Sequence, residues 1–334
     1  MIRSSPRRAA WRKLAALAAI LALAPLVAAG PALAQAWPAR PVKLIAPYPA
    51  GGGVDTVARL VGERLAPRLG QSITVDNKPG AGATIGADAL AKSPPDGYTL
   101  MVGSITDYAI APHIHKNLGF EMKKDLAAAA EIGSGTVVLV VNGDFPASTV
   151  KELIAQAKAR PGAFSYASSG IGGLQHLNAE MFKQMAGVDL VHVPYKGTTQ
   201  FLPDLLSGRV PMSIDSLPAH LPHIRAGKLR ALAVASRARS AALPEVPTMA
   251  EAGLAGYETA TNYTLFAPAG TPRDIIERLN RETNAVLQMP EVREKLLAMG
   301  IVVSGGPVEA VQARIPAEID KWARVIKTAN LRFD

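Results

Sequence analysis

Three glycine-rich loops carry the residue types best suited to binding a small anion. They read Pro49-Ala-Gly-Gly-Gly-Val-Asp55, Lys78-Pro-Gly-Ala-Gly82 and Ser168-Ser-Gly-Ile-Gly-Gly173. Each follows an apolar run typical of a strand and precedes a helix-like segment, so its backbone N–H groups are unpaired at the positive end of a helix dipole. Such loops bind phosphate or carboxylate groups. Two early loops and one central loop therefore predict a cleft that grips an anion from both sides.

The first loop is the most informative. Gly51, Gly52 and Gly53 lack side chains, so their backbone amides can approach a ligand closely. A tight strand-to-helix turn without a ligand would have the same composition. We assign Asp55 a capping role, because a carboxylate at a helix N-terminus competes with an anionic ligand.

Polar side chains near other strand ends extend the predicted site. Ser168 and Ser169 can donate to a carboxylate, and His176 lies in the first turns of the next helix-like segment. That histidine is equally consistent with a capped, half-buried structural role. Ser104 and Thr106 follow another strand-like run, where ligand sites form in α/β proteins.

Asp215 also ends an apolar run, and it either caps the next segment or binds a ligand ammonium or hydroxyl group. Lys196 adds positive charge near the cleft, or is a solvated loop lysine. Ser168, His176 and Asp215 can be drawn as a catalytic triad, but triads are defined by geometry that the sequence lacks. The predicted ligand-binding residues are Pro49, Ala50, Gly51, Gly52, Gly53, Ser104, Thr106, Ser168, Ser169, Gly170, His176 and Asp215.

The sequence contains no motif for a cofactor or for catalysis. No glycine loop completes GxGxxG, and neither a GxxxxGK[ST] loop nor a GxSxG elbow occurs. His113-x-His115 and His220-x-x-His223 hint at metal binding, but there is no HExxH. We therefore predict no cofactor, no metal and no enzymatic activity.

The N-terminus has the three-part layout of a secretory signal peptide. Basic residues at positions 3–13 precede an apolar run, Leu14–Ala29, and then Ala32-Leu33-Ala34. A membrane anchor is the alternative, but the run is shorter than the roughly 20 residues that a span needs. We expect cleavage near Ala34 and a periplasmic location.

The composition and net charge of the chain limit the kinds of ligand and partner that we expect it to bind. The whole chain carries a net charge of +9, but removing the predicted signal leaves 31 basic against 27 acidic residues, or +4. This balance suits an anionic ligand. Without a dense basic run, and with 5% aromatic residues, the chain does not resemble a nucleic-acid-binding protein. The absence of cysteine excludes disulfides. We expect a soluble monomer.

Strand-like and helix-like segments alternate, which predicts an α/β fold with mainly parallel sheets. Expected strands are Val42–Pro47, Ile73–Asp76, Thr99–Gly103, Thr136–Asn142, Phe164–Ala167, Leu190–Pro194, Pro211–Asp215, Leu229–Ala235 and Thr264–Ala267. Expected helices are Thr56–Leu69, Ser148–Arg160, Leu174–Ala186, Thr271–Gln288, Glu291–Met299 and Val308–Thr328, the last interrupted by Pro316.

Polar or proline-bearing breaks flank the middle third of the chain, which favours two lobes joined by two hinge crossings. After a signal peptide at 1–34, we expect lobe I at 35–140 plus 246–334 and lobe II at 141–245. A single large sheet is the alternative.

Six sequence blocks occur in an order that resembles the Bug-type solute receptors of tripartite tricarboxylate transporters, also called TctC-like receptors. The resemblance covers nearly all of the chain after the signal. The blocks are Trp37-Pro-x-Arg-Pro-Val42, Pro47–Arg59, Asn77-Lys-Pro-Gly-Ala-Gly82, Pro95-Asp-Gly-Tyr-Thr-Leu100, His192-Val-Pro-Tyr-Lys-Gly197 and Phe266-Ala-Pro-Ala-Gly-Thr-Pro272.

The resemblance implies a type II periplasmic binding protein, or Venus flytrap, that holds a dicarboxylate, tricarboxylate, acidic amino acid or aromatic carboxylate. It implies main-chain contacts from Pro49–Gly53, opposed by the central loop, with Asp215 helping to select the ligand. Its partners would be the membrane subunits of a tripartite transporter. Ser104-Ile-Thr-Asp107 departs from the family pattern beside the expected ligand. An exported α/β hydrolase and a sensor for a membrane signalling system are the alternatives.

Overall fold

The computed structural model describes residues 37–115 and 117–328. The predicted signal peptide and the tail after Thr328 lie outside the described residues. Arg40 begins a compact unit that runs to the C-terminus, and residues up to Ala39 belong to a separate unit. Within the described ranges, no helix combines the length and the apolar character needed to cross a membrane.

The central feature of the compact unit is a mixed sheet in the order β2-β1-β3-β9-β4-β7-β5-β6, with β8 and β10 also paired to β4. The strands are β1 Val42–Ala46, β2 Ile73–Asn77, β3 Thr99–Gly103, β4 Leu126–Asn142, β5 Ser165–Ser168, β6 Val191–Pro194, β7 Met212–Ser216, β8 Leu229–Val234, β9 Ala260–Pro268 and β10 Ile301–Val303.

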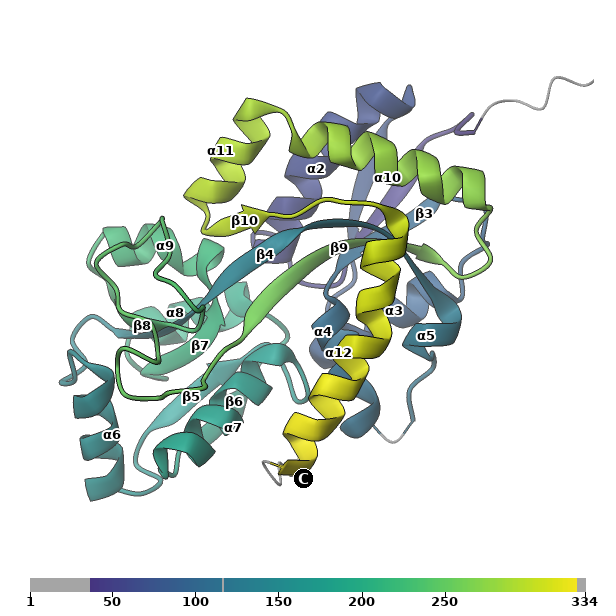
Figure 1. Ribbon diagram of the computed structural model, residues 1–334. Helices are drawn as coiled ribbons and strands as arrows, with labels where there is room; N and C mark the ends of the chain where they lie inside the picture. Colours follow the sequence, from purple (N-terminus) through teal and green to yellow (C-terminus); the bar gives the residue numbers. More distant parts are fainter. Residues whose placement is uncertain (1–36, 116, 329–334) are drawn as a thin grey trace, which may run out of the picture. The chain divides into compact units, whose positions relative to one another are not determined.

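Helices flank this sheet along its length (Figure 1). They are α2 Gly53–Leu69, α3 Thr84–Ala91, α4 Ile105–Ile110, α5 Met122–Asp125, α6 Val150–Ala159, α7 Leu174–Ala186, α8 Thr198–Leu206, α9 Leu217–Arg225, α10 Arg273–Leu287, α11 Pro290–Ala298 and α12 Val308–Thr328. Short 3₁₀ turns are η2 Ala81–Ala83 and η3 Ala111–His113.

Strand β4 links the two halves of the sheet. It pairs with β9 as far as Thr136, and from Val137 onward it pairs with β7 and β8. Figure 1 shows β4 and β9 running side by side from one half toward the other. We call the half with β1–β3, β10, α2–α5 and α10–α12 lobe I, and the half with β5–β8 and α6–α9 lobe II.

Parallel pairing holds away from these linking strands, as the apolar runs predicted. Strand β1 pairs in parallel with β2 and β3, and β5 pairs in parallel with β6 and β7. All pairs that involve β4 or β9 are antiparallel. The sheet is therefore mixed, because the two strands that cross between the lobes run in opposite directions.

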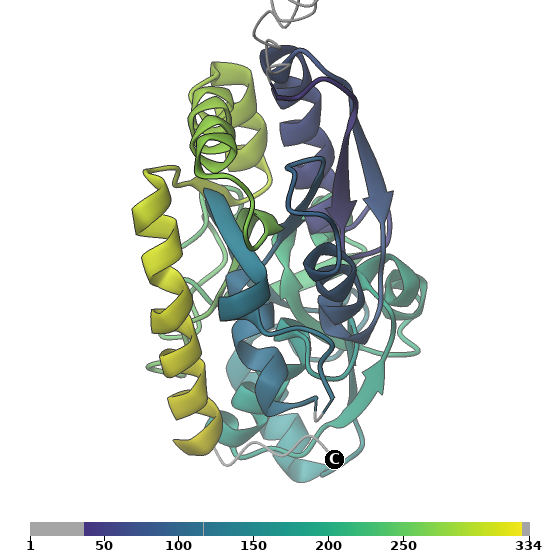
Figure 2. The same ribbon diagram turned by 90° about the vertical axis from the view of Figure 1, so that its right-hand side faces the viewer.

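The apolar run of β4 is continuous because both of its faces are buried in lobe II. Val137, Leu139 and Val141 pack into one core cluster, while Val138 and Val140 pack into the cluster on the other face. Strands covered on both faces lack the apolar–polar alternation of half-exposed strands. Helix α12 lies on the opposite side of the unit from β1 and β2 (Figure 2).

Several expectations need correction, and two of them concern long elements. The last helix passes through Pro316 without a break, because α12 is continuous from Val308 to Thr328. The strand expected at Thr136–Asn142 begins ten residues earlier, at Leu126. That added stretch, Leu126–Gly135, is rich in alanine and glycine, which have low strand propensity, and pairing with β9 determines its structure.

Candidate functional site

The N-termini of two long helices converge on one small cavity between the lobes. Helix α2 begins at Gly53 and α7 begins at Leu174, and both residues line the cavity. Its volume is about 20 Å³, roughly enough for one water molecule. The two halves are therefore in contact around this cavity. The lining residues are Tyr48, Pro49, Gly52, Gly53, Val54, Asp107, Leu174, Gln175, Thr198, Ser216 and Thr261.

The first predicted loop supplies one wall of this cavity. Pro49, Gly52 and Gly53 line it, whereas Ala50 and Gly51 are exposed at its edge. The helix starts three residues earlier than expected, so Gly52 is its N-cap and Gly53 its first residue. The N–H groups of this first turn have no acceptor within the helix.

Asp55 does not cap helix α2, whose N-terminus has no side-chain cap, and instead binds the loop that precedes the helix. Its carboxylate accepts hydrogen bonds from the Gly51 N–H at 2.9 Å, from Asn77 and from Arg59. Burial acts to raise the pKa of Asp55, but these hydrogen bonds outweigh it and lower the pKa below its usual value. The Asp55 carboxylate therefore stabilises the first glycine loop within lobe I.

The second and third glycine loops meet across the lobes, backbone against backbone. A Cβ atom on Gly82 would lie 2.8 Å from the Gly173 nitrogen, and one on Gly170 would lie 3.3 Å from the Gly82 nitrogen. Gly82 and Gly170 also have φ values of 60° and 123°, which disfavour other residues. These glycines therefore permit the close approach of the two lobes.

Asp215 organises the lobe II wall. One carboxylate oxygen accepts from Gln175 Nε2 at 2.9 Å and from the Ser216 N–H at 2.6 Å. The other accepts from Thr198 Oγ1 at 2.6 Å and lies 3.0 Å from His220 Nε2. Burial acts to raise the pKa of Asp215, but its bonds to His220, Thr198 and Gln175 outweigh burial and lower it. Asp215 thereby positions Gln175, Thr198 and Ser216, which line the cavity.

Asp107 bridges the lobes across the cavity. Its Oδ2 accepts from the Tyr48 hydroxyl at 2.9 Å, on the lobe I side, and its Oδ1 accepts from the Leu174 N–H at 3.2 Å. Leu174 is the first residue of α7, so a side-chain carboxylate occupies the N-terminus of the lobe II helix. Burial raises the pKa of Asp107 to about 7, against the bonds from Tyr48 and Leu174, and the charge of Asp215 adds to the rise.

This pKa predicts a pH dependence of stability. An aspartate in the unfolded chain loses its proton near pH 4, whereas folded Asp107 keeps it up to about pH 7. The free energy of unfolding should therefore decrease between these values as pH rises. We expect Asp107→Asn to remove on the order of 2 kcal/mol of this decrease. Urea unfolding of the wild type and of Asp107→Asn at pH 5 and pH 8 measures this difference. The same pH dependence in both proteins would contradict the raised pKa of Asp107.

Ser168 and His176 make hydrogen bonds within and beside the central loop. The Ser168 hydroxyl lies 2.6 Å from His192 Nε2 and also contacts Gly170, while His176 Nδ1 accepts from the Gly172 N–H. The rings of His176 and His192 stack with centroids 4.0 Å apart. Burial lowers the pKa of both histidines. Ser168 is hydrogen-bonded to His192 and Asp215 to His220, so the triad drawn from the sequence does not assemble.

The remaining predicted residues do not line this cavity. Ser104 caps α4 by accepting from the Asp107 N–H, and the Ser169 hydroxyl is buried without a hydrogen-bond partner in the described part of the chain. Lys196 is exposed. Thr106 accepts from Asn262 and donates to Glu318 of α12.

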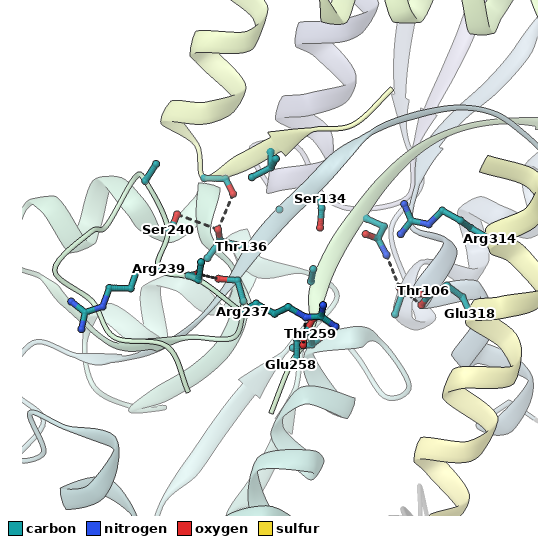
Figure 3. A pocket seen from close by; sticks show the side chains of 18 of the residues that line it. Thr106, Ser134, Thr136, Arg237, Arg239, Ser240, Glu258, Thr259, Arg314 and Glu318 are labelled. Atoms are coloured by element: carbon teal, nitrogen blue, oxygen red, sulfur yellow. Dashed lines mark hydrogen bonds and ion pairs between the residues drawn. The ribbon is translucent and has the colours of Figure 1, made fainter. Parts of the chain in front are cut away.

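Thr106 instead lines a larger cavity of about 520 Å³ beside β4, β9 and α12 (Figure 3). Neither α2 nor α7 contributes to its wall. Its cationic side chains all lie near acidic ones, in the pairs Arg237–Glu258, Arg239–Glu251, Arg314–Glu131 and Lys321–Glu318. Because these cations of the described residues already have acidic partners, and the N-termini of α2 and α7 do not reach this cavity, we place the candidate site in the smaller cavity.

Sequence reasoning missed six polar side chains that line the cavity: Tyr48, Asp107, Gln175, Thr198, Ser216 and Thr261. Tyr48 and Thr198 are adjacent in sequence to predicted loops, so their positions already indicated that they could lie at the site. Asp107 stood in a segment recognised as unusual, but nothing local indicated its contact with Leu174, 67 residues away.

The fold and the opposed helix N-termini define the class: a two-lobed α/β periplasmic binding protein. Residues 57–331 match the model of the tripartite tricarboxylate transporter family receptor. The chain belongs to this family, a family of solute-binding receptors, which confirms the resemblance drawn from the sequence blocks.

Individual relatives agree with this membership. The chain is 38% identical to the protein BugT of Bordetella pertussis over 323 residues, which are 96% of this chain and 98% of BugT. It is 39% identical to Rpa4515 of R. palustris, solved with adipate, with a TM-score of 0.85 over 88% of this chain and 98% of that one. It is 31% identical to MatC of Rhodopseudomonas palustris with bound malate, with a TM-score of 0.83 over 87% and 100% of the chains.

Proposed function

We propose that this protein is an exported receptor that binds a small carboxylate between its lobes and delivers it to the membrane subunits of a tripartite transporter. The candidate ligands are dicarboxylates, tricarboxylates, acidic amino acids and aromatic carboxylates. The protein would act in the periplasm, as a monomer, after cleavage near Ala34. It would act without a cofactor and without catalysis.

One observation carries the proposal: the N-termini of α2 and α7 face the same cavity from opposite lobes. A helix N-terminus attracts an anion through its dipole and through the N–H groups of its first turn, which have no acceptor within the helix. Among the described residues that line the cavity there is no lysine or arginine. Main-chain amides and hydroxyl groups would therefore make the contacts to the carboxylate.

Capture would couple to lobe closure. A ligand that contacts both lobes stabilises the closed state by its differential affinity for that state. The division we propose, 35–140 plus 246–334 against 141–245, puts α2 and α7 in different lobes. Closure would then present a joint surface of both lobes to the transporter.

A melting experiment tests this function. A carboxylate at 100 times its dissociation constant should stabilise the protein by about 2.7 kcal/mol and raise its Tm by a few degrees. The panel is citrate, succinate, malate, adipate, glutamate, aspartate, nicotinate and terephthalate. Dimethyl succinate and dimethyl adipate serve as matched uncharged controls. A shift with an acid but not with its ester supports the proposal, whereas no shift with any acid, or equal shifts with the esters, contradicts it.

A further inference from the structure

We propose that Asp107 is a specificity-determining residue that stands in for one carboxylate of the ligand, so that the cleft selects an amino monocarboxylate over a dicarboxylate. The inference rests on the proposed function and deepens it. The ligand's carboxylate would bind at the N-terminus of α2, and its ammonium group would face Asp107.

The first argument is that the anion position of α7 is already taken. The Leu174 N–H, the first of that helix, donates to Asp107 Oδ1 at 3.2 Å. Asp107 is 3% exposed and is held on its other oxygen by Tyr48. A second carboxylate from a ligand would have to displace this buried side chain or lie against it, and like charges at close range repel.

The second argument is that the α2 position is open to an anion. The carboxylate nearest to it, Asp55, accepts from Gly51 outside the cavity and is bound by Arg59 and Asn77. Gly53 and Val54, in the first helical turn, line the cavity. A single ligand carboxylate can therefore approach the first-turn N–H groups of α2, whereas the first N–H of α7 already donates to Asp107.

The third argument is the set of acceptors beside Asp107. The amide nitrogen of Gln175 donates to Asp215, which turns the amide oxygen away from that carboxylate. This buried Oε1 atom has no hydrogen-bond partner within the described ranges, and Gln175 is 9% exposed and lines the cavity. An ammonium group brings three donors. The unused lone pairs of Asp107 and the Gln175 oxygen are acceptors of matching type.

The charge balance of the cavity points the same way. Among the described residues that line the cavity, Asp107 is the one ionisable carboxylate, and Asp215 lies directly behind Gln175 and Thr198. No cationic side chain of the described residues lines the cavity. A zwitterionic ligand adds one negative charge near a helix dipole and one positive charge near Asp107, whereas a dicarboxylate adds a second negative charge beside it.

Matched ligand pairs test the inference. Calorimetry at pH 8 compares succinate with 4-aminobutanoate, glutarate with 5-aminopentanoate, and adipate with 6-aminohexanoate, on the wild type and on Asp107→Asn. We expect at least one amino acid to bind wild type tenfold or more tightly than its dicarboxylate partner. Asp107→Asn, which has the same shape without the charge, should reduce or reverse that preference. Asp96→Asn, at an exposed aspartate paired with Arg40, is the matched control and should keep the wild-type preference.

The outcomes separate the two proposals. A wild type that prefers the dicarboxylates, with the same preference in Asp107→Asn, overturns the role of Asp107 but leaves carboxylate capture standing. A wild type that binds neither these six compounds nor any acid of the melting panel overturns the proposed function and this inference together. Circular dichroism of both variants confirms that they are folded before binding is compared.

Discussion

Asp215→Ala should destabilise the protein by about 3–5 kcal/mol and abolish tight ligand binding. The substitution removes a buried carboxylate that accepts from Gln175, Ser216 and Thr198 and pairs with His220. Each of these groups is buried, so each lost bond leaves a polar group without compensation. A loss of this size lowers the Tm by roughly 10 °C in a chain of this length.

Asp215→Ala should also weaken ligand binding independently of its effect on stability, because three of the four groups that contact Asp215 line the cavity. Asp215→Asn is the milder variant, since its amide oxygen can still accept from the Ser216 N–H and from Gln175. The control is Asp96→Ala, at an exposed pair with Arg40, which should cost about 1 kcal/mol or less. Calorimetric melting of Asp215→Ala, Asp215→Asn and Asp96→Ala measures the order of their stabilities. An Asp215→Ala protein as stable as Asp96→Ala would show that the hydrogen-bond cluster contributes little.

Acid should weaken the same cluster. The pKa of Asp215 is lowered in the folded protein, so its contribution to stability is present above the unfolded value near pH 4 and is lost as pH falls through the lower folded value. Asp107 acts in the opposite sense, because its pKa is raised. The two aspartates thus act in opposite directions on stability, in adjacent pH windows.

The sequence was informative where the local pattern decides the structure. Thr99–Gly103 is a strand and Leu174–Ala186 a helix at the predicted bounds, because an apolar run and a glycine C-cap are local signals. The three glycine loops were also found, since each needs backbone conformations or close approaches that few other residues permit. The six sequence blocks that resemble the receptor family extended the prediction from local elements to the whole fold.

Long-range contacts limited the prediction of the site. Ser168 was expected to donate to a ligand, but the structure gives its hydroxyl a neighbour on the adjacent strand, His192. Asp215 was expected to cap a segment or to touch a ligand, and the structure surrounds it with donors from α7, α8 and α9. Asp107 lies in a six-residue helix, too short for a periodic signal, and its partner Leu174 is distant in sequence. The ligand-binding residues named from the sequence stay predictions.

Closure should fail in Gly197→Ala. Gly197 precedes α8 in lobe II, and a Cβ atom there would lie 2.5 Å from Cγ of Pro49 in lobe I and closer still to its Cδ. Its φ of 165° is extended backbone that any residue adopts, so alanine adds no local strain. The methyl group would instead keep the lobes apart, because Pro49 is a rigid ring on the first loop.

We therefore expect Gly197→Ala to bind the best carboxylate of the melting panel roughly 10- to 100-fold more weakly, a loss of about 1.4–2.8 kcal/mol. Small-angle scattering should show that the ligand reduces the radius of gyration of the wild type but not that of Gly197→Ala. Gly62→Ala is the matched control, because a Cβ at that position meets only Leu44 and Ile73 within lobe I. Wild-type affinity and compaction in Gly197→Ala would mean that ligand capture does not require the Pro49–Gly197 contact. Because the substitution removes no group that lines the cavity, a loss of affinity would show that the binding energy depends on bringing the lobes together.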